Sequence, residues 1–369
     1  MRASSRKLLV VAVGLGVLGF VAYRARGLFH FGDFSGAKLL HAVRDADLFL
    51  LVLSVLAIYS CYALRSLRWQ VFQRNHGPSH FWNIYKLTLA GFACVFLLGR
   101  AGEPVRPMLL ARTERLPLSG MFGIYVLERV FDIASTAIIA AIGLLLFRGH
   151  TGHTQGRGAL TSALGSSLFL GLLAGIAVLI YLRLHGTALL ERRLQNVLAT
   201  HSWKGKAARI ALGFARGVQT IRTWSQLVLA VLYSALHWFL VLLVYFWVLH
   251  SFGGPLRDLS LRDVMIVMAF TSMGSVVQLP GVGGGSQVLT TFALTKIFDV
   301  PNELAVVAAI VLWLTTFASC SLAGVPLLLH QGWSLGELRE MAKHEDEIVD
   351  QEMADSSAGT KIRQGDSPE

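Results

Sequence analysis

Long apolar windows with almost no charge constrain this chain more than any other feature. They lie near residues 8–23, 47–64, 81–99, 118–147, 163–182, 226–250, 263–279, 286–299 and 302–330. Several reach about 20 residues, the length that a helix needs to cross a hydrocarbon layer roughly 30 Å thick. Charged residues make up only 15% of the sequence, against about 25% in ordinary soluble domains. We therefore expect an all-α polytopic membrane protein.

The distribution of basic residues predicts the topology. The longest polar stretch, 183–224, contains eight Lys/Arg and one acidic residue, and the N-terminus also begins with a basic cluster. Both regions are expected in the cytoplasm, because cytoplasmic loops carry the excess of Lys/Arg. Both placements hold only if the 81–99 segment enters the membrane and returns to the same side. Residues 65–80 and 100–117, with three and four Lys/Arg, then both face the cytoplasm.

The same order of segments occurs twice, in residues 47–147 and in residues 226–330. Each half contains a full span, a broken hairpin that dips into the membrane, and a second full span. The two hairpins enter from opposite sides, which makes the halves an inverted-topology repeat. With the remaining windows, this predicts a helical bundle of about six full spans plus two re-entrant broken hairpins.

Three regions complete the expected organisation of the chain around the 47–330 membrane domain. Residues 1–46 are expected to form an N-terminal signal-anchor helix and loop, because no cleavage site follows the first apolar run. Residues 183–224 form the basic cytoplasmic loop. Residues 331–369, with ten acidic and four basic residues, read as an acidic cytoplasmic tail that is partly disordered. We expect a multi-pass protein of the cell inner membrane with both termini in the cytoplasm.

The first break in the apolar pattern is the string Gly99-Arg-Ala-Gly-Glu-Pro-Val-Arg106. Its glycines permit a tight turn, and its proline can begin a new helix. Exposed amides together with Arg100 and Arg106 would suit an anionic phosphate, with Glu103 orienting an arginine or binding a cationic group. The alternative is an ordinary cytoplasmic loop.

A second charged string, Leu127-Glu-Arg-Val-Phe-Asp132, lies inside an apolar window. After Asp132 only 15 residues remain before Arg148, about 22 Å of helix, so the charges must lie at membrane depth. Glu128 and Asp132 share a helix face, and Arg129 can reach Asp132. They form either a cavity-facing cluster for a polar headgroup or an internal ion pair to one of the arginines of the first break; both can hold together.

The second break, Pro280-Gly-Val-Gly-Gly-Gly285 followed by Ser286-Gln287, carries no charge. Glycines let backbones approach closely or leave amides free for an anion. We expect it to face the same central cavity as the first break, with these candidate binding residues: Gly281, Gly283, Gly284 and Gln287. The alternative is a plain helix break or a contact between small residues.

Motifs of soluble active sites are missing from this sequence. It has no Walker-A pattern, no G-x-S-x-G elbow, no H-E-x-x-H and no paired CxxC, and its three cysteines all lie in apolar segments. We therefore expect no catalytic residues, no cofactor, no metal site and no nucleic-acid partner; the chain is not expected to be an enzyme.

The paired motifs resemble those of a known family. Gly99–Arg106 followed by Leu127–Asp132 is similar to the signature of the lysylphosphatidylglycerol synthase transmembrane region, a flippase-like family, and Leu279–Gln287 is similar to its second signature. The resemblance covers roughly residues 45–330. It implies a helical bundle that moves or accommodates a lipid with a charged headgroup. Gln287 departs from the glutamate that the family often carries there.

The resemblance leaves two functions open. The preferred one is a lipid flippase-like transporter whose partners are membrane lipids, anionic or phosphate-bearing. The second is a non-transporting membrane subunit that presents a lipid-linked substrate to a separately encoded transferase. The family's larger synthases carry a soluble aminoacyl-transferase domain, and the 39 residues after 330 are too few for one. The oligomeric state is left open.

Overall fold

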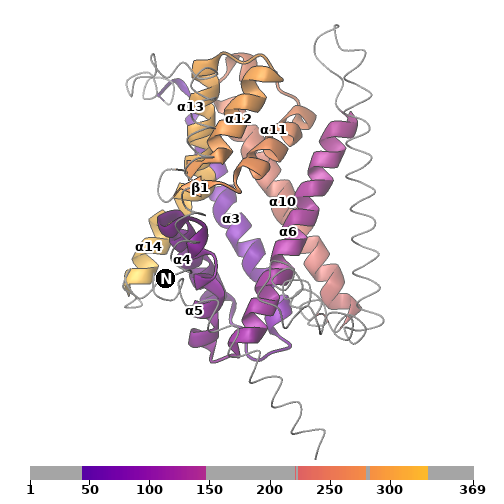
Figure 1. Cartoon of the computed structure of the whole chain (residues 1–369), viewed down its shortest axis with the longest axis vertical. Helices are drawn as coiled ribbons and strands as arrows, with labels where there is room; N and C mark the ends of the chain where they lie inside the picture. Colours follow the sequence, from indigo (N-terminus) through magenta and orange to yellow (C-terminus); the bar gives the residue numbers. More distant parts are fainter. Residues whose placement is uncertain (1–43, 147–220, 222, 280–282, 331–369) are drawn as a thin grey trace, which may run out of the picture.

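The chain forms a bundle of helices, seen in the computed structural model of Figure 1. The structure describes residues 44–146, 221, 223–279 and 283–330. Four elements run from one end of the bundle to the other: α3 (Leu48–Gln73), α6 (Leu118–Leu146), α10 (Trp224–Ser251), and the interrupted helix made of α13 (Asn302–Trp313), the π-helical turn η4 (Leu314–Ala318) and α14 (Ser319–His330).

Two further units are broken hairpins. The first consists of α4 (Phe81–Leu98), the 3-10 turn η2 (Gly99–Gly102) and α5 (Val105–Glu114). The second follows the short turn η3 (Gly254–Leu256) and consists of α11 (Leu261–Gly274), the strand pair β1 (Gln278–Leu279) and β2 (Gly283–Gly284), and α12 (Gly285–Lys296). The two strands are antiparallel, with Gln278 opposite Gly284.

Hydrogen bonds at the two ends of the bundle fix the helix directions. At one end, the Asp47 amide donates to the Ser251 carbonyl (2.8 Å), which joins the start of α3 to the end of α10. At the other end, the side-chain amides of Asn75 and Gln226 donate hydrogen bonds to each other at 3.0 and 3.1 Å. α3 and α10 are therefore antiparallel neighbours.

The two hairpins enter the bundle from opposite ends. α4 and α5 lie in the lower half of Figure 1, α11 and α12 lie in the upper half, and the first strand of the second hairpin contacts η2 between them. Each hairpin is flanked by two of the long elements in the same chain order. This confirms the inverted repeat expected from the sequence.

The exits from the two hairpins share a backbone signature. Arg115 and Asp299 are the two non-glycine residues with positive φ, both +53°, in the part of the chain that the structure describes. Each is followed by an apolar residue, a proline and the start of a long helix. A left-handed residue ends the returning arm, and the proline then suits the start of the next helix. The repeat thus extends to the local backbone.

Glycines make the tip of the second hairpin possible. Gly283 and Gly284 have φ values of +98° and +142°, which residues with a Cβ rarely adopt. Gly274 and Gly285 bring α11 and α12 together so closely that a Cβ on either would meet the backbone carbonyl of the other. α11 and α12 are therefore in direct backbone contact next to the break.

Five helices of the described part are long and apolar enough to cross a membrane: α3, α4, the Gly120–Leu146 stretch of α6, α10 and the Asn302–His330 unit. This confirms an all-α multi-pass membrane protein. Four of them are expected full spans, and α4 is an arm of the first hairpin. The expected spans at 8–23 and 163–182 lie outside the described residues, as do the tail 331–369, nearly all of the loop 183–224, and residues 1–43 of the N-terminal region.

Two segments expected to face the cytoplasm are largely helical. Residues 65–73 belong to α3, because the arginines in this stretch are buried against acidic partners instead of ending the span. Residues 105–114 form α5, the returning arm of the first hairpin, and Val105–Ala111 are buried because this arm packs against α4 and α6. Only the connections around these helices remain non-helical.

Candidate functional site

A cluster of ionised side chains is buried in the bundle, in a place where hydrophobic packing would be expected. It joins α3, α5 and α6 and consists of Arg65, Arg68, Arg106, Glu128 and Asp132. Arg68 and Glu128 are each only 1% exposed. Burying a charge requires a partner, since an isolated ion in a medium of low dielectric is very costly. We call this set the ionic cluster.

Glu128 of α6 accepts hydrogen bonds from both α3 and α5 and so joins three helices. Its Oε1 accepts from Arg65 at 2.8 Å, from Arg68 at 3.2 Å and from Arg106 at 3.3 Å. Its Oε2 pairs with the other terminal nitrogen of Arg106. Because Arg65 and Arg68 come from α3 and Arg106 comes from α5, this one carboxylate ties a full span and a hairpin arm to α6.

Asp132 lies one turn further along the same face of α6. Its Oδ1 accepts from Arg68 at 2.7 Å and from the Trp238 indole of α10 at 3.4 Å. Its Oδ2 accepts from Arg65 at 3.0 Å and pairs with Arg129 at 3.3 Å. The i,i+4 relation of the two carboxylates thus lets two arginines of α3 bond both of them.

His237 of α10 closes the cluster as a neutral residue. Its Nδ1 lies 3.2 Å from the Cys61 carbonyl, which can only accept, so Nδ1 carries the proton. Its Nε2 lies 3.2 Å from Arg65, which can only donate. Ser234, one turn earlier, accepts from Arg68 at 2.9 Å. α10 therefore adds hydrogen bonds to the cluster without adding charge.

Aromatic rings cover the arginine of the first hairpin. The Arg106 guanidinium lies 4.5 Å from the centre of the Trp69 ring and 5.6 Å from that of Phe92. Phe92 also lies 5.0 Å from the Arg65 guanidinium. Cation–π contacts of this kind are strongest where the cation is desolvated. They add to the ion pairs that hold these guanidinium groups in place.

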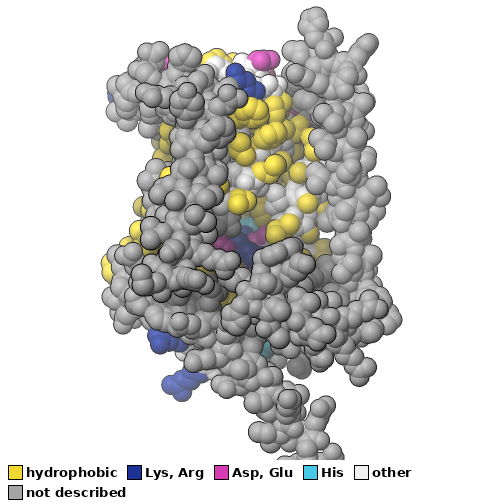
Figure 2. Space-filling view, viewed as in Figure 1, with side chains coloured by type: hydrophobic (Ala, Val, Ile, Leu, Met, Phe, Trp, Pro, Cys, Tyr) yellow, Lys and Arg dark blue, Asp and Glu magenta, His cyan; other side chains and the backbone are white. Residues whose placement is uncertain are grey.

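The cluster is more accessible on one side, next to Arg129. The Arg129 side chain is 33% exposed, and its guanidinium lies 5.4 Å from the Tyr125 ring. The Tyr125 hydroxyl donates to Glu103 at 2.5 Å, which connects the first break to this side. Figure 2 shows acidic, basic and histidine side chains at mid-height, below an apolar surface. Among the arginines of the cluster and its contacts, Arg129 is the most exposed.

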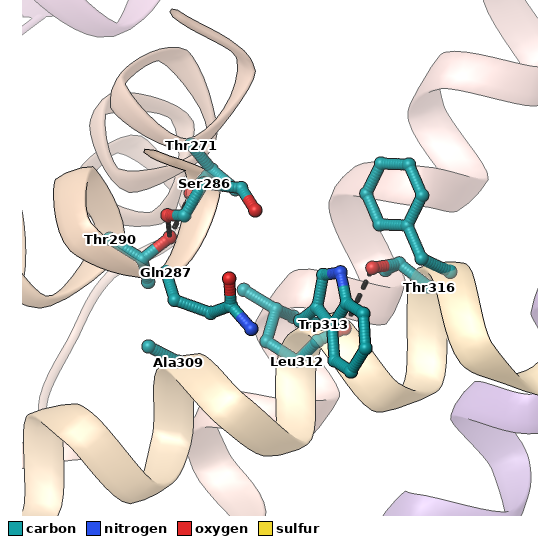
Figure 3. A pocket seen from close by; sticks show the side chains of 9 residues that line it. Thr271, Ser286, Gln287, Thr290, Ala309, Leu312, Trp313 and Thr316 are labelled. Carbon is teal, nitrogen blue, oxygen red and sulfur yellow. Dashed lines mark hydrogen bonds between the residues drawn. The ribbon is translucent and has the colours of Figure 1, made fainter. Parts of the chain in front are cut away.

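The second break lines a different, uncharged pocket. It is a shallow recess without enclosed space for a water molecule. In Figure 3, the Gln287 amide points from α12 toward Trp313, while Thr271, Ser286 and Thr290 gather on the other side. The Thr271 and Thr290 hydroxyls lie 2.6 Å apart. No charged side chain lines this pocket.

The Gln287 side chain holds the start of α12, which lies across the pocket from the π-helical turn η4. The Gly284 amide donates to the Gln287 side-chain oxygen, which caps α12. Across the pocket, Thr316 belongs to the π-helical turn η4, and the Tyr62 hydroxyl of α3 donates to its carbonyl at 3.3 Å. π-turns inside helices recur at functional sites. The second hairpin thus lines its pocket with neutral polar groups, opposite a π-turn.

The structure brings five of the sequence-predicted site residues to one place, on or beside the ionic cluster: Glu103, Arg106, Glu128, Arg129 and Asp132. The expected i,i+3 pair of Arg129 and Asp132 is present, and so is the bond from Arg106. Gly283, Gly284 and Gln287 instead lie at the second hairpin and its pocket. The Arg100 side chain and Gly281 lie outside the described residues.

Sequence reasoning missed the contribution of α3 and α10. The predicted site did not include Arg65, Arg68 or His237, although each of the two arginines forms ion pairs with both Glu128 and Asp132. The available signal was their spacing: Tyr62, Arg65 and Trp69 recur at helical intervals directly after an apolar window, as on one face of a continuing helix. No group of His, Cys, Asp or Glu in the described residues is arranged to hold a metal ion.

A family model described as the lysylphosphatidylglycerol synthase TM region matches residues 7–324. The match confirms the resemblance seen in the paired motifs, and it covers both hairpins and the whole ionic cluster. No curated protein and no solved structure matches the chain.

Proposed function

The chain belongs to the lysylphosphatidylglycerol synthase TM region family, and from this premise we propose that it is a flippase-like protein that accommodates or translocates a lipid with a charged headgroup. The headgroup binds at the ionic cluster, and the acyl chains stay in the bilayer. The expected setting is the inner membrane, with both termini in the cytoplasm. We propose this as a transport function without a chemical step of its own.

One observation carries the proposal: charged side chains are concentrated beside the first of two broken hairpins that enter from opposite ends. Ionisable residues at membrane depth are costly, and they mark substrate pathways by default. Broken segments that meet near the midplane are the usual construction of transporter binding sites. Here α5 supplies Arg106, and α6 supplies Glu128 and Asp132, directly next to the tip of the first hairpin.

The two ends of the bundle suggest how access would alternate. The hairpins meet through η2 and β1, so a shift of either tip would change the seal at that end without moving the four long elements. Without a nucleotide-binding motif in the sequence, movement of the lipid would follow its gradient or be coupled to an ion or to the membrane potential.

A headgroup-accessibility assay in reconstituted vesicles tests the proposal. Fluorescent phospholipids are placed in both leaflets, and an impermeant quencher reports how fast the inner pool appears outside. We expect the full chain to accelerate exchange, and we expect Arg129→Gln to slow it at least several-fold. Arg129 is suited to this test because it is partly exposed and its removal leaves the Glu128 bonds intact.

Arg257→Gln is the matched control, because Arg257 is exposed and lies after η3, away from the cluster. It should exchange lipid at the wild-type rate. Exchange no faster than in protein-free vesicles would contradict transport by this chain alone. Equal rates for the wild type and Arg129→Gln would contradict the assignment of the site.

A further inference from the structure

The charge balance of the ionic cluster identifies the sign of its occupant. Resting on the proposed function, we propose that the cluster binds the anionic phosphate of a lipid headgroup, and that its carboxylates are internal counter-ions instead of ligands for a cationic group. The two readings of Glu128 and Asp132 predict opposite lipid selectivity.

The cluster contains more guanidinium groups than carboxylates. Four arginines contact it, on α3, α5 and α6: Arg65, Arg68, Arg106 and Arg129. Two carboxylates, Glu128 and Asp132, face them, and His237 is neutral by its hydrogen bonds. Glu103, which accepts from Tyr125 beside Arg129, reduces the excess from two positive charges to one. A buried excess of one sign favours a ligand of the other sign.

The carboxylates have little capacity left for a cationic ligand. Three arginines donate to Oε1 of Glu128, its Oε2 is ion-paired with Arg106, and both oxygens of Asp132 accept from arginines. A cationic headgroup would have to displace an arginine that is held by two carboxylates and, for Arg65, by His237. The displaced guanidinium would then be buried without a partner, which is strongly unfavourable.

The arginines retain donors for an anion. The Nε atoms of Arg65, Arg68 and Arg129 are buried and have no hydrogen-bond partner among the residues described by the structure. Buried donors are nearly always satisfied, so these Nε groups are available to an acceptor such as a phosphate oxygen. Phosphate oxygens accept several charge-assisted bonds at once, and guanidinium groups are the side chains best matched to them.

The accessible side of the cluster presents a cation first. Arg129 is the most exposed of the four arginines, and Asp132 lies behind it as its ion-pair partner. An approaching phosphate therefore meets Arg129 before it meets Asp132, and Glu103 beside Tyr125 is the one carboxylate on this side among the described residues of the cluster.

Binding of synthetic lipids to the purified full chain in detergent tests this inference. Three dioleoyl probes differ in charge: phosphatidylglycerol is anionic, phosphatidylcholine is zwitterionic, and dioleoyl trimethylammonium propane is cationic and lacks phosphate. Inorganic phosphate is the fourth probe. We expect the tightest binding for phosphatidylglycerol, weaker binding for phosphatidylcholine, and none for the cationic lipid.

Two substitutions that change the net charge of the cluster in opposite directions distinguish a phosphate site from a site for a cationic group. Arg129→Gln should weaken phosphatidylglycerol binding about 10-fold, the effect of one lost charge-assisted bond. Glu103→Gln keeps an oxygen for the Tyr125 hydroxyl but increases the positive excess, so it should tighten binding. Arg257→Gln, on the surface, controls for non-specific attraction of anionic lipid and should change nothing. Unfolding curves confirm that each variant is folded.

The outcomes distinguish this inference from the proposed function. Tightest binding of the cationic lipid, or weaker anion binding by Glu103→Gln, overturns the phosphate assignment and leaves lipid transport standing. Binding of inorganic phosphate as tight as that of phosphatidylglycerol supports the anion site and contradicts a lipid substrate. Binding of none of the four probes overturns both.

Discussion

The two broken hairpins share a topology but differ in chemistry. The first hairpin places Arg106 against Glu128, in a cluster of ions that joins three helices. The second surrounds its pocket with hydroxyl and amide groups, such as those of Thr290 and Gln287, and no charge lines that pocket. The inverted repeat therefore fixes the backbone of both halves, while the side chains give only one half an ionic site.

The halves are also held together by different means. Around the first hairpin, long arginine side chains bridge α3, α5 and α6 through ion pairs. Around the second, Gly274 and Gly285 allow direct backbone contact between α11 and α12. An ionic half suits ligand binding, and a close-packed half suits a rigid support. The predictions that follow challenge this division, in order of decreasing effect on stability.

Loss of the shared carboxylate should have the largest effect. Glu128→Gln removes the charge that faces three arginines, and breaking a buried pair in this way costs about 3–5 kcal/mol. The measurement is the free energy of unfolding in detergent. Asp258→Asn, at an exposed position after η3, is the control and should behave as the wild type. A small effect of Glu128→Gln would mean that the cluster is hydrated and not buried.

Forcing apart the two arms of the second hairpin, α11 and α12, should cause the next largest loss of stability. In Gly274→Val, the new side chain meets the Gly285 carbonyl, and overpacking of this kind costs about 1–3 kcal/mol. Thermal unfolding of the detergent-solubilised chain measures it. Met273→Ala changes the adjacent residue, whose side chain is 67% exposed, and should shift the midpoint much less. Equal shifts would remove the argument for direct backbone contact.

The smallest expected effect on stability comes from replacing a tryptophan beside each hairpin. The Trp69 indole donates to Gln73 at 3.1 Å, whereas the Trp313 indole, 8% exposed, has no hydrogen-bond partner among the described residues. Trp69→Phe should therefore cost about 1 kcal/mol, and Trp313→Phe should be close to neutral. The same unfolding assay compares them. A loss at Trp313 as large as that at Trp69 would show that the neutral pocket holds an acceptor.

Much of this arrangement follows from the sequence. Charges in apolar windows and glycine-bearing breaks predict the hairpins and the inverted repeat. The i,i+4 spacing predicts that Glu128 and Asp132 share a face, because helix geometry decides it locally. The partner Arg106 was among the arginines expected to reach them.

The rest depends on contacts between distant segments. The sequence pattern places Arg65 and Arg68 after the span 47–64, on the cytoplasmic side, because a hydropathy pattern treats an arginine as the end of a span. Only the carboxylates of α6, 60 or more positions away, make their burial favourable. The separation of Gln287 from the ionic cluster likewise results from the packing of α12 on α13, which no local spacing encodes.

The central claim is that the two hairpins enter from opposite sides and that the first of them contributes to the ionic cluster; cysteine labelling of intact cells tests the opposite entry most directly. The three native cysteines are buried and are first replaced. Single cysteines then replace Thr113 and His80, at the ends of the first hairpin, and Asp258 and Asp299, at the ends of the second. We predict that an impermeant maleimide labels one pair from outside and the other pair only after the cells are opened. Labelling of all four positions from the same side would contradict the account.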